Sequence, residues 1–176
     1  MKTPRIHTAK RIIHAPAESI YPAMTDADQL KLWLAPDGAA VDLMDFDLRP
    51  GGQYRMVTRF NDPDDAGRGR DGEDIIHVRF IDIIRDQQIV QAVDFESDDP
   101  DLAGTMRLSW ILDEVLGGTR VIARAEHVPP GIEMRGHEAA MSSSLERLAH
   151  LVEESPEFRE KGPIVLRQSR GTRRPH

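Results

Sequence analysis

The residues best suited to chemistry lie in one segment near the end of the chain, His137-Glu138-Ala139-Ala140-Met141. A zinc protease places two histidines four residues apart on one helical face, so that both bind the metal. Met141 occupies the second of these positions, and methionine is a poor zinc ligand. We therefore predict no metal site. We expect His137 and Glu138 to be polar groups either facing a pocket or at its surface rim.

Two other histidines lie in strand-like patterns. His77 shares an expected strand face with isoleucines at positions 75, 81 and 83, and His127 alternates with Val121, Ala123 and Ala125. A histidine on an apolar strand face can act as a general base in a pocket, because its pKa is close to neutral pH. The alternative is a structural histidine held by a hydrogen bond. We assign no catalytic residue from these patterns, and we expect binding rather than enzymatic activity.

Other chemistries lack their sequence signatures. Ser142-Ser143-Ser144 has no surrounding GxSxG elbow, and the chain contains no Walker loop or GxGxxG turn. The acidic loops at 61–74 and 94–101 lack the ligand spacing of a calcium loop. The chain has no cysteine, which excludes disulfides and thiolate metal sites. We predict no cofactor.

A long helix from Glu133 to Glu153 must position the His137 segment. One line along this helix is mostly apolar, and the opposite side carries Glu146, Arg147 and His150 with Ser143. The first half of the apolar line contains two flexible methionines and Glu138. Such a helix suits the role of a lid over a cavity. The apolar line comprises Met134, Glu138, Met141, Leu145, Leu148 and Val152.

The rest of the chain predicts an α+β protein with an antiparallel sheet. A strand at 5–14 precedes two short helices at 17–24 and 27–34, and turn residues then separate alternating segments. Six or seven strands followed by one late helix indicate a curved sheet wrapped on that helix. The later strands are expected at 41–48, 54–60, 75–84, 88–95, 105–112 and 119–127.

Length and charge indicate one soluble domain at residues 1–154 and a basic tail at 155–176. The chain has 176 residues, 39% hydrophobic, and no apolar run long enough to span a membrane. The tail holds six basic and two acidic side chains, so the net charge of −7 leaves −11 on the first 154 residues. An acidic body argues against a nucleic-acid partner. The absence of cysteine and of a signal peptide favours a cytoplasmic location.

Several short segments carry a family resemblance. They are Ala15-Pro16-Ala17-Glu18 with Ile20-Tyr21, Ala23-Met24-Thr25-Asp26, Leu30, Trp33, Leu48 to Arg55, Gly117 to Val121, and Leu145-Glu146-Arg147-Leu148. Together they resemble the helix-grip superfamily of START lipid-transfer domains, polyketide cyclases and pathogenesis-related allergens. Within it, the chain is similar to the branch named for the C-terminal domain of activators of the heat-shock protein 90 ATPase. The resemblance implies a helix-grip fold over about residues 6–153.

The chain departs from that branch in two ways. Many relatives have Gly-Trp in the last helix where this chain has Ala140-Met141. A methionine there softens the wall of a cavity. The full chaperone activators also carry an additional N-terminal domain, and nothing precedes the fold here. We therefore do not expect the chain to stimulate that chaperone.

We predict a ligand cavity between the sheet and the last helix, lined by apolar side chains with a few polar groups. The alternative is that the same side chains fill the core. The expected ligand-binding residues are Trp33, Tyr54, Met56, His77, Phe95, Met106, Trp110, Met134, His137 and Met141.

The leading hypothesis is non-catalytic binding of a small apolar or amphipathic molecule. A second hypothesis is a cyclase- or hydrolase-like enzyme with His77 or His137 as general acid/base and Tyr54 as an orienting hydroxyl. A third is a protein-interaction module, either a chaperone partner or a homodimer joined through residues 164–166 and the basic tail.

Overall fold

The computed structural model describes residues 3–62 and 72–154 of the chain. These residues form a seven-stranded sheet, three α-helices and one turn of 3-10 helix at Pro100–Leu102. The helices are α1 (Ala17–Thr25), α2 (Ala27–Leu34) and α3 (Met134–Glu153). The strands are β1 (Ile6–Ile13), β2 (Ala39–Met44), β3 (Gln53–Phe60), β4 (Glu73–Ile84), β5 (Gln88–Phe95), β6 (Thr105–Val115) and β7 (Gly118–Glu126).

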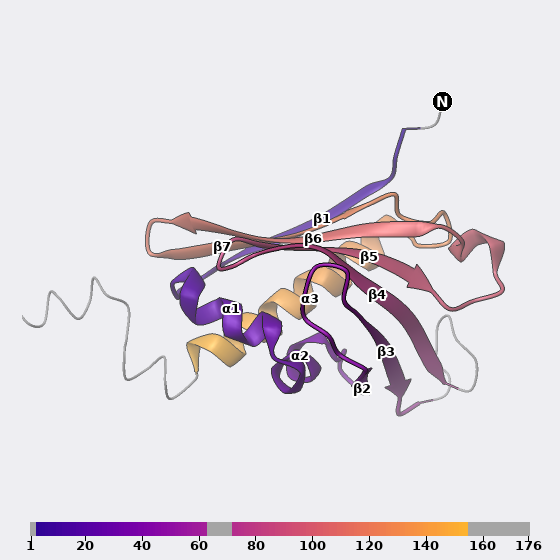
Figure 1. Ribbon diagram of the computed structural model, residues 1–176, viewed down its shortest axis with the longest axis horizontal. Helices are drawn as coiled ribbons and strands as arrows, with labels where there is room; N and C mark the ends of the chain where they lie inside the picture. Colours follow the sequence, from indigo (N-terminus) through magenta and orange to yellow (C-terminus); the bar gives the residue numbers. More distant parts are fainter. Residues whose placement is uncertain (1–2, 63–71, 155–176) are drawn as a thin grey trace, which may run out of the picture.

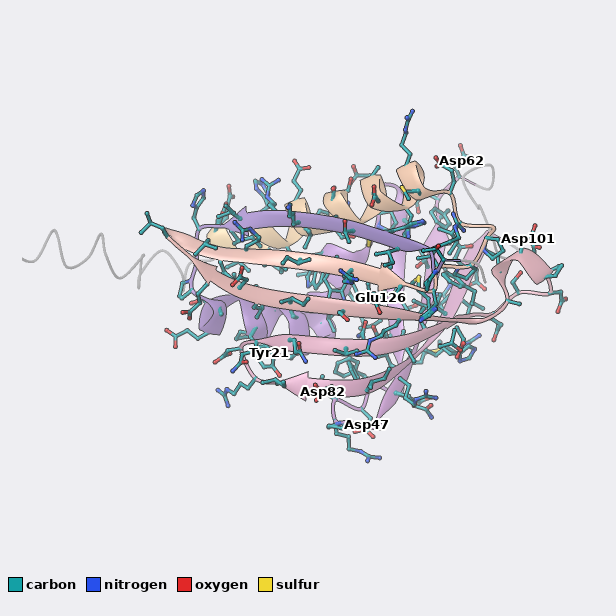
Figure 2. The ribbon with its side chains drawn as sticks, turned by 90° about the horizontal axis from the view of Figure 1, so that it is seen from above. Tyr21, Asp47, Asp62, Asp82, Asp101 and Glu126 are labelled. Carbon is teal, nitrogen blue, oxygen red and sulfur yellow. The ribbon has the colours of Figure 1, made fainter. Side chains whose placement is uncertain are left out.

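The sheet is antiparallel throughout, in the order β1-β7-β6-β5-β4-β3-β2. Only β1 leaves the sequential order, because it pairs with β7, the last strand. The sheet curves around α3, and α1 and α2 lie on the same side as α3 (Figure 1). Seen from above, the strands lie in front of the helices, and Glu126 lies on the strand face turned away from them (Figure 2). The predicted helix-grip fold is therefore confirmed.

Helix α3 is fixed at its start by a side-chain cap and along its length by the core. The Glu133 carboxylate accepts hydrogen bonds from the backbone N–H groups of Arg135 and Gly136 at 3.2 and 2.7 Å. The helix packs on β1, α1 and α2, and Leu145 and Leu148 have no exposed surface. Each buried leucine contributes about 1.5–3 kcal/mol relative to an exposed one. The second half of α3 is therefore the anchored half, as the sequence predicts.

Helices α1 and α2 are held together by Trp33. Asp26 ends α1 and caps α2, and its carboxylate accepts from the N–H of Gln29 at 3.2 Å. The Trp33 indole N–H donates to the carbonyl of Ala23 at 2.8 Å, and its ring is 1% exposed. A buried indole with a satisfied N–H contributes packing without a desolvation cost. This contact holds α2 against the end of α1 and sets one wall of the interior.

The expected elements agree closely with the structure except at β2 and at the end of β6, which runs to Val115 rather than to residue 112. We predicted a strand at 41–48, whereas β2 spans Ala39–Met44 and ends before Asp45, which has a φ of 56°. Aspartate tolerates this left-handed backbone conformation better than most residues, and the conformation breaks the strand. The tail at 155–176, including residues 164–166 of the hypothetical homodimer contact, lies outside the described residues.

Candidate functional site

A cavity of about 550 Å³ lies between the sheet, α2 and α3. This volume is in the range of cavities that hold small molecules. Five of its lining residues are exposed and mark its opening: Asp37, Glu96, Ser97, Ala140 and Ser143. The interior is mainly apolar. It is formed by Met24, Leu30, Trp33, Leu34, Tyr54, Met56, Phe60, Ile76, Val78, Ile89, Val93, Phe95, Leu102, Met106, Leu108, Trp110, Ile132 and Met141.

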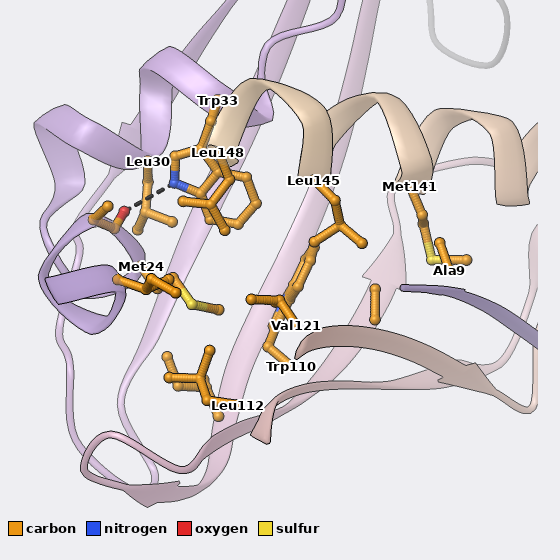
Figure 3. Packing of buried hydrophobic residues seen from close by; sticks show 14 of the residues in the cluster. Ala9, Met24, Leu30, Trp33, Trp110, Leu112, Val121, Met141, Leu145 and Leu148 are labelled. Carbon is orange, nitrogen blue, oxygen red and sulfur yellow. Dashed lines mark hydrogen bonds between the residues drawn. The ribbon is translucent and has the colours of Figure 1, made fainter. Parts of the chain in front are cut away.

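Two tryptophans form one side of this interior. Trp33 from α2 and Trp110 from β6 meet edge to face, with ring centroids 5.2 Å apart. Figure 3 shows them beside Leu145 and Leu148 of α3, and all four side chains belong to the same hydrophobic core cluster. An edge-to-face pair is worth about 0.5–1.5 kcal/mol beyond its buried area. The pair forms a stable aromatic wall at this side of the cavity.

A chain of polar groups crosses the apolar wall. The Trp110 indole N–H donates to Gln91 Oε1 at 3.3 Å, and Gln91 Nε2 donates to the Tyr54 hydroxyl at 3.4 Å. All three residues line the cavity and are buried. Burial raises the pKa of the Tyr54 hydroxyl to about 12, against a smaller opposing effect of the Gln91 hydrogen bond. Tyr54 is therefore a neutral O–H donor at neutral pH, suited to orienting a ligand but not to acting as a base.

The side of α3 that faces the cavity is narrow. His137, Ala140, Ser144 and Arg147 recur every three or four residues and lie on one flank, roughly a quarter turn from the leucine line. The middle two have small side chains, and Ser143 beside them is equally small. Small residues leave space between the helix and the sheet, and this space is part of the cavity. The same flank carries the polar side chains of His137 and Arg147 in the cavity wall.

A second histidine, His7 of β1, contacts the ring of His137. The Nδ1 atoms of His7 and His137 lie 2.8 Å apart, so one ring donates and the other accepts. His7 lies on β1, is fully buried and does not line the cavity; its Nε2 has no hydrogen-bond partner among the described residues. Burial lowers the pKa of His7, Arg5 adds to this effect, and Glu138 and Glu133 oppose it. His7 is therefore kept neutral beside a histidine of the cavity wall.

Our prediction for His77 placed it on the wrong face of β4. Ile76 and Val78 point into the cavity, and His77 is exposed, where its Nε2 lies 3.0 Å from Glu96 Oε1. This hydrogen bond, followed by the nearby Arg55, lowers the pKa of Glu96. A bulge between Phe80 and Asp82 shifts the alternation, so the residues at 75, 77, 81 and 83 do not share one face.

The structure brings eight of the ten expected ligand-binding residues to the cavity. They are Trp33, Tyr54, Met56, Phe95, Met106, Trp110, His137 and Met141. Met134 is half exposed at the start of α3 and, like His77, does not line it. His127 is exposed, adopts a φ of 56° and follows the end of β7, so it does not continue the apolar face. Whether the eight bind a ligand remains a prediction.

Sequence reasoning missed His7, Gln91 and Arg147. His7 alternates with the buried Ala9 and Ile13 on β1, which is the signal that could have identified it. Gln91 lies in a run of consecutive buried residues in β5, and this run shows no alternation that would mark the face of Gln91. We placed Arg147 on the solvent side of α3, but it lines the cavity because α3 has a second contact face. A single apolar stripe does not reveal that face.

A metal site finds no support in the geometry. Among residues 3–62 and 72–154, no group of three or more His, Asp or Glu side chains is placed to hold a metal ion. Met141 is packed in the core and in the cavity wall. None of the described helices is long and apolar enough to cross a membrane.

Comparison with known families settles the classification. Residues 14–153 match the family model described as activator of Hsp90 ATPase homolog 1-like protein. The chain belongs to this family. The match covers α1 to α3 and all strands except β1, so it includes all the residues that line the cavity. No curated protein matches the chain significantly.

Solved structures of similar proteins agree with this membership. Protein CV1439 from Chromobacterium violaceum is 26% identical with a TM-score of 0.74, over 85% of this chain and 98% of that one. Protein NE0264 from Nitrosomonas europaea is 22% identical with a TM-score of 0.64, over 85% and 94%. Protein MLL2253 from Mesorhizobium loti is 14% identical with a TM-score of 0.68, over 86% and 98%. The last two likenesses support the fold alone.

Proposed function

We propose that this member of the activator of Hsp90 ATPase homolog 1-like family binds a small apolar or amphipathic molecule without transforming it. The observation that carries the proposal is the cavity of about 550 Å³, whose wall is apolar except for a few placed polar groups. Tyr54 and Gln91 provide hydrogen-bonding groups within that wall. The cavity also opens to the surface beside α3, so a ligand has a route of entry.

Filling the cavity from α3 tests the proposal. Met141 lines the cavity and is 6% exposed, so M141W should reduce its volume. We expect M141W to bind the neutral fluorescent probe N-phenyl-1-naphthylamine at least about tenfold more weakly than the unchanged protein. M134W is the matched control, because Met134 lies on the same helix, is half exposed and does not line the cavity. Equal affinity in M141W and M134W would contradict the proposal.

A second candidate function is a cyclase- or hydrolase-like enzyme. The observation that favours it is the contact between His137, a cavity-wall residue, and the buried His7. A histidine whose ring is oriented by a buried partner has the arrangement of a general acid/base. Its test is turnover of a library of small esters and polyketide-like substrates: activity that disappears in H137A but persists in H77A would support it.

The third hypothesis, a protein-interaction module or homodimer, depends on residues 164–166 and the basic tail, which lie outside the described residues. It remains a prediction. Truncation after Glu154 tests it, since an unchanged solution mass and unchanged partner capture would argue against an interface there.

A further inference from the structure

We propose that the ligand carries a carboxylate and that Arg147 binds it at the mouth of the cavity. This inference rests on the proposed function, because it assigns the chemical class of the molecule in the same cavity. Arg147 lies on the flank of α3 that faces the cavity and is partly buried. Next to it on the same flank are Ser143, which is exposed at the opening, and Ser144.

The guanidinium of Arg147 is oriented by two hydrogen bonds but has no counter-ion among residues 3–62 and 72–154. Its Nε donates to the carbonyl of Trp33 at 3.0 Å, and its Nη2 donates to Ser144 Oγ at 3.2 Å. No carboxylate of the described residues lies within ion-pair distance of it. Arginine has five N–H donors, so these two bonds fix the plane and leave the Nη1 donors for another acceptor.

Three arginines of the sheet show the opposite arrangement. Arg59 binds Asp42 and Glu73, Arg120 binds Asp113, and Arg124 binds Glu126. A lone arginine in a partly desolvated wall costs free energy unless an anion accompanies it. The position of Arg147 is therefore explained by a ligand anion, and a planar carboxylate matches the fork of a guanidinium.

The other charges around the cavity favour a ligand with a single negative charge. Asp37, Asp74 and Glu96 also line the cavity, and the first 154 residues carry a net negative charge. Glu96 is paired with His77 and Arg55. These carboxylates repel a multiply charged anion such as a phosphate monoester. A carboxylate has the smallest charge that still pairs with Arg147.

The cavity has room for the apolar part of such a molecule. His137 lies ten residues before Arg147 on the same flank, and both line the cavity, so it extends about 15 Å along α3. Near Arg147 the wall includes Trp33, whose carbonyl accepts from the Arg147 Nε, and Trp110 packs against the Trp33 ring. An alkyl or aromatic body buried there leaves its carboxylate at the opening. The ligand class is thus an amphipathic carboxylic acid.

The experiment compares two ligands that differ only in the head group. Decanoate and 1-decanol each displace N-phenyl-1-naphthylamine from the full-length protein at pH 8, where the acid is ionised. We expect decanoate to bind more tightly than 1-decanol. In R147M, decanoate should weaken by about tenfold or more, while 1-decanol should change little. The control R107M removes an exposed arginine between the cavity residues Met106 and Leu108, and it should leave both affinities unchanged.

The results distinguish the carboxylate anchor at Arg147 from apolar ligand binding in the cavity. Retained 1-decanol binding in R147M shows that the cavity is intact, so a selective loss of decanoate supports the carboxylate anchor. Equal binding of the two ligands, or an equal change of both in R147M, overturns the anchor but leaves apolar ligand binding standing. Failure of the probe and of both ligands to bind the unchanged protein overturns the proposed function itself. R147K is the second variant. Lysine keeps the positive charge but lacks the planar guanidinium, so R147K should retain part of the preference for decanoate.

Discussion

His7 and His137 share one proton between Nδ1 atoms that lie 2.8 Å apart, and this contact joins β1 to the soft half of α3. Leucines anchor the second half of the helix, whereas the first half depends on this pair and on a bond from the backbone N–H of Thr8 to Glu138 Oε2 at 2.8 Å. Protonation of the pair therefore affects how one end of the cavity lid is held.

We predict that His7 makes the protein less stable as the pH falls below about 6.5, the pKa of an unperturbed histidine. Burial lowers the pKa of His7 in the folded state, so between the two pKa values the unfolded chain binds more protons. The stabilisation is complete above the unfolded pKa and is lost as the pH falls toward the folded one. H7Q should be less stable at pH 7.5, and its urea midpoint should fall less between pH 7.5 and 5.5.

The control for this prediction is H14Q, because His14 is exposed directly after the same strand. If H7Q and the unchanged protein lose the same stability on acidification, another group carries the effect. The groups nearest His7 are Arg5, Glu133, Glu138 and His137.

Gln91 should matter more than Tyr54 for stability. Y54F removes one partner of the Gln91 amide and should cost about 1 kcal/mol. Q91L leaves both the Trp110 indole N–H and the Tyr54 hydroxyl buried without their partner, so it should cost about 2–4 kcal/mol. Urea unfolding measures both, with Q53A on the exposed face of β3 as control. Equal losses in Y54F and Q91L would show that the chain of hydrogen bonds is not the cause.

Gly118 should not tolerate a side chain. A Cβ at this position would lie 2.2 Å from the carbonyl oxygen of Ile13, and that neighbour is backbone, which moves only with the β1–β7 pairing. We expect G118A to destabilise the protein by about 1–3 kcal/mol. L116A, at an exposed position in the same turn, should change stability by less than about 0.5 kcal/mol. A thermal unfolding scan compares the two, and a neutral G118A would show that β1 can shift.

The sequence was sufficient for the fold because most elements have a clear pattern and boundary, β2 being an exception. Asp26 marks the join of α1 and α2, and alternation identifies the face of Tyr54, Met56, Thr58 and Phe60. Features that depend on tertiary placement were missed. The bulge after Phe80 reverses the face of the residues that follow it, so the isoleucines at 81 and 83 do not mark the face of His77, which precedes the bulge. No local pattern announces such an inserted residue.

The site was harder to predict than the core because its polar members depend on two elements meeting. The helical pattern of α3 alone predicts that Arg147 is exposed to solvent. Arg147 lines the cavity because α2 places the Trp33 carbonyl within hydrogen-bond distance of it. His7 and His137 are 130 positions apart in the chain and meet only through the packing of α3 on β1. Apolar wall residues were easier to find, since each belongs to a periodic face.

The pairing of the first strand with the last has a consequence for biosynthesis. During translation β1 emerges first but cannot pair until Gly118–Glu126 has left the ribosome. Until then the edge of β1 that pairs with β7 is exposed. Closing the long loop between β1 and β7 is slow compared with forming the hairpins between consecutive strands. α3 follows β7 in the chain and packs on β1. The cavity is therefore completed only after α3 has been made, and a nascent chain that stops before β7 lacks the wall that α3 provides.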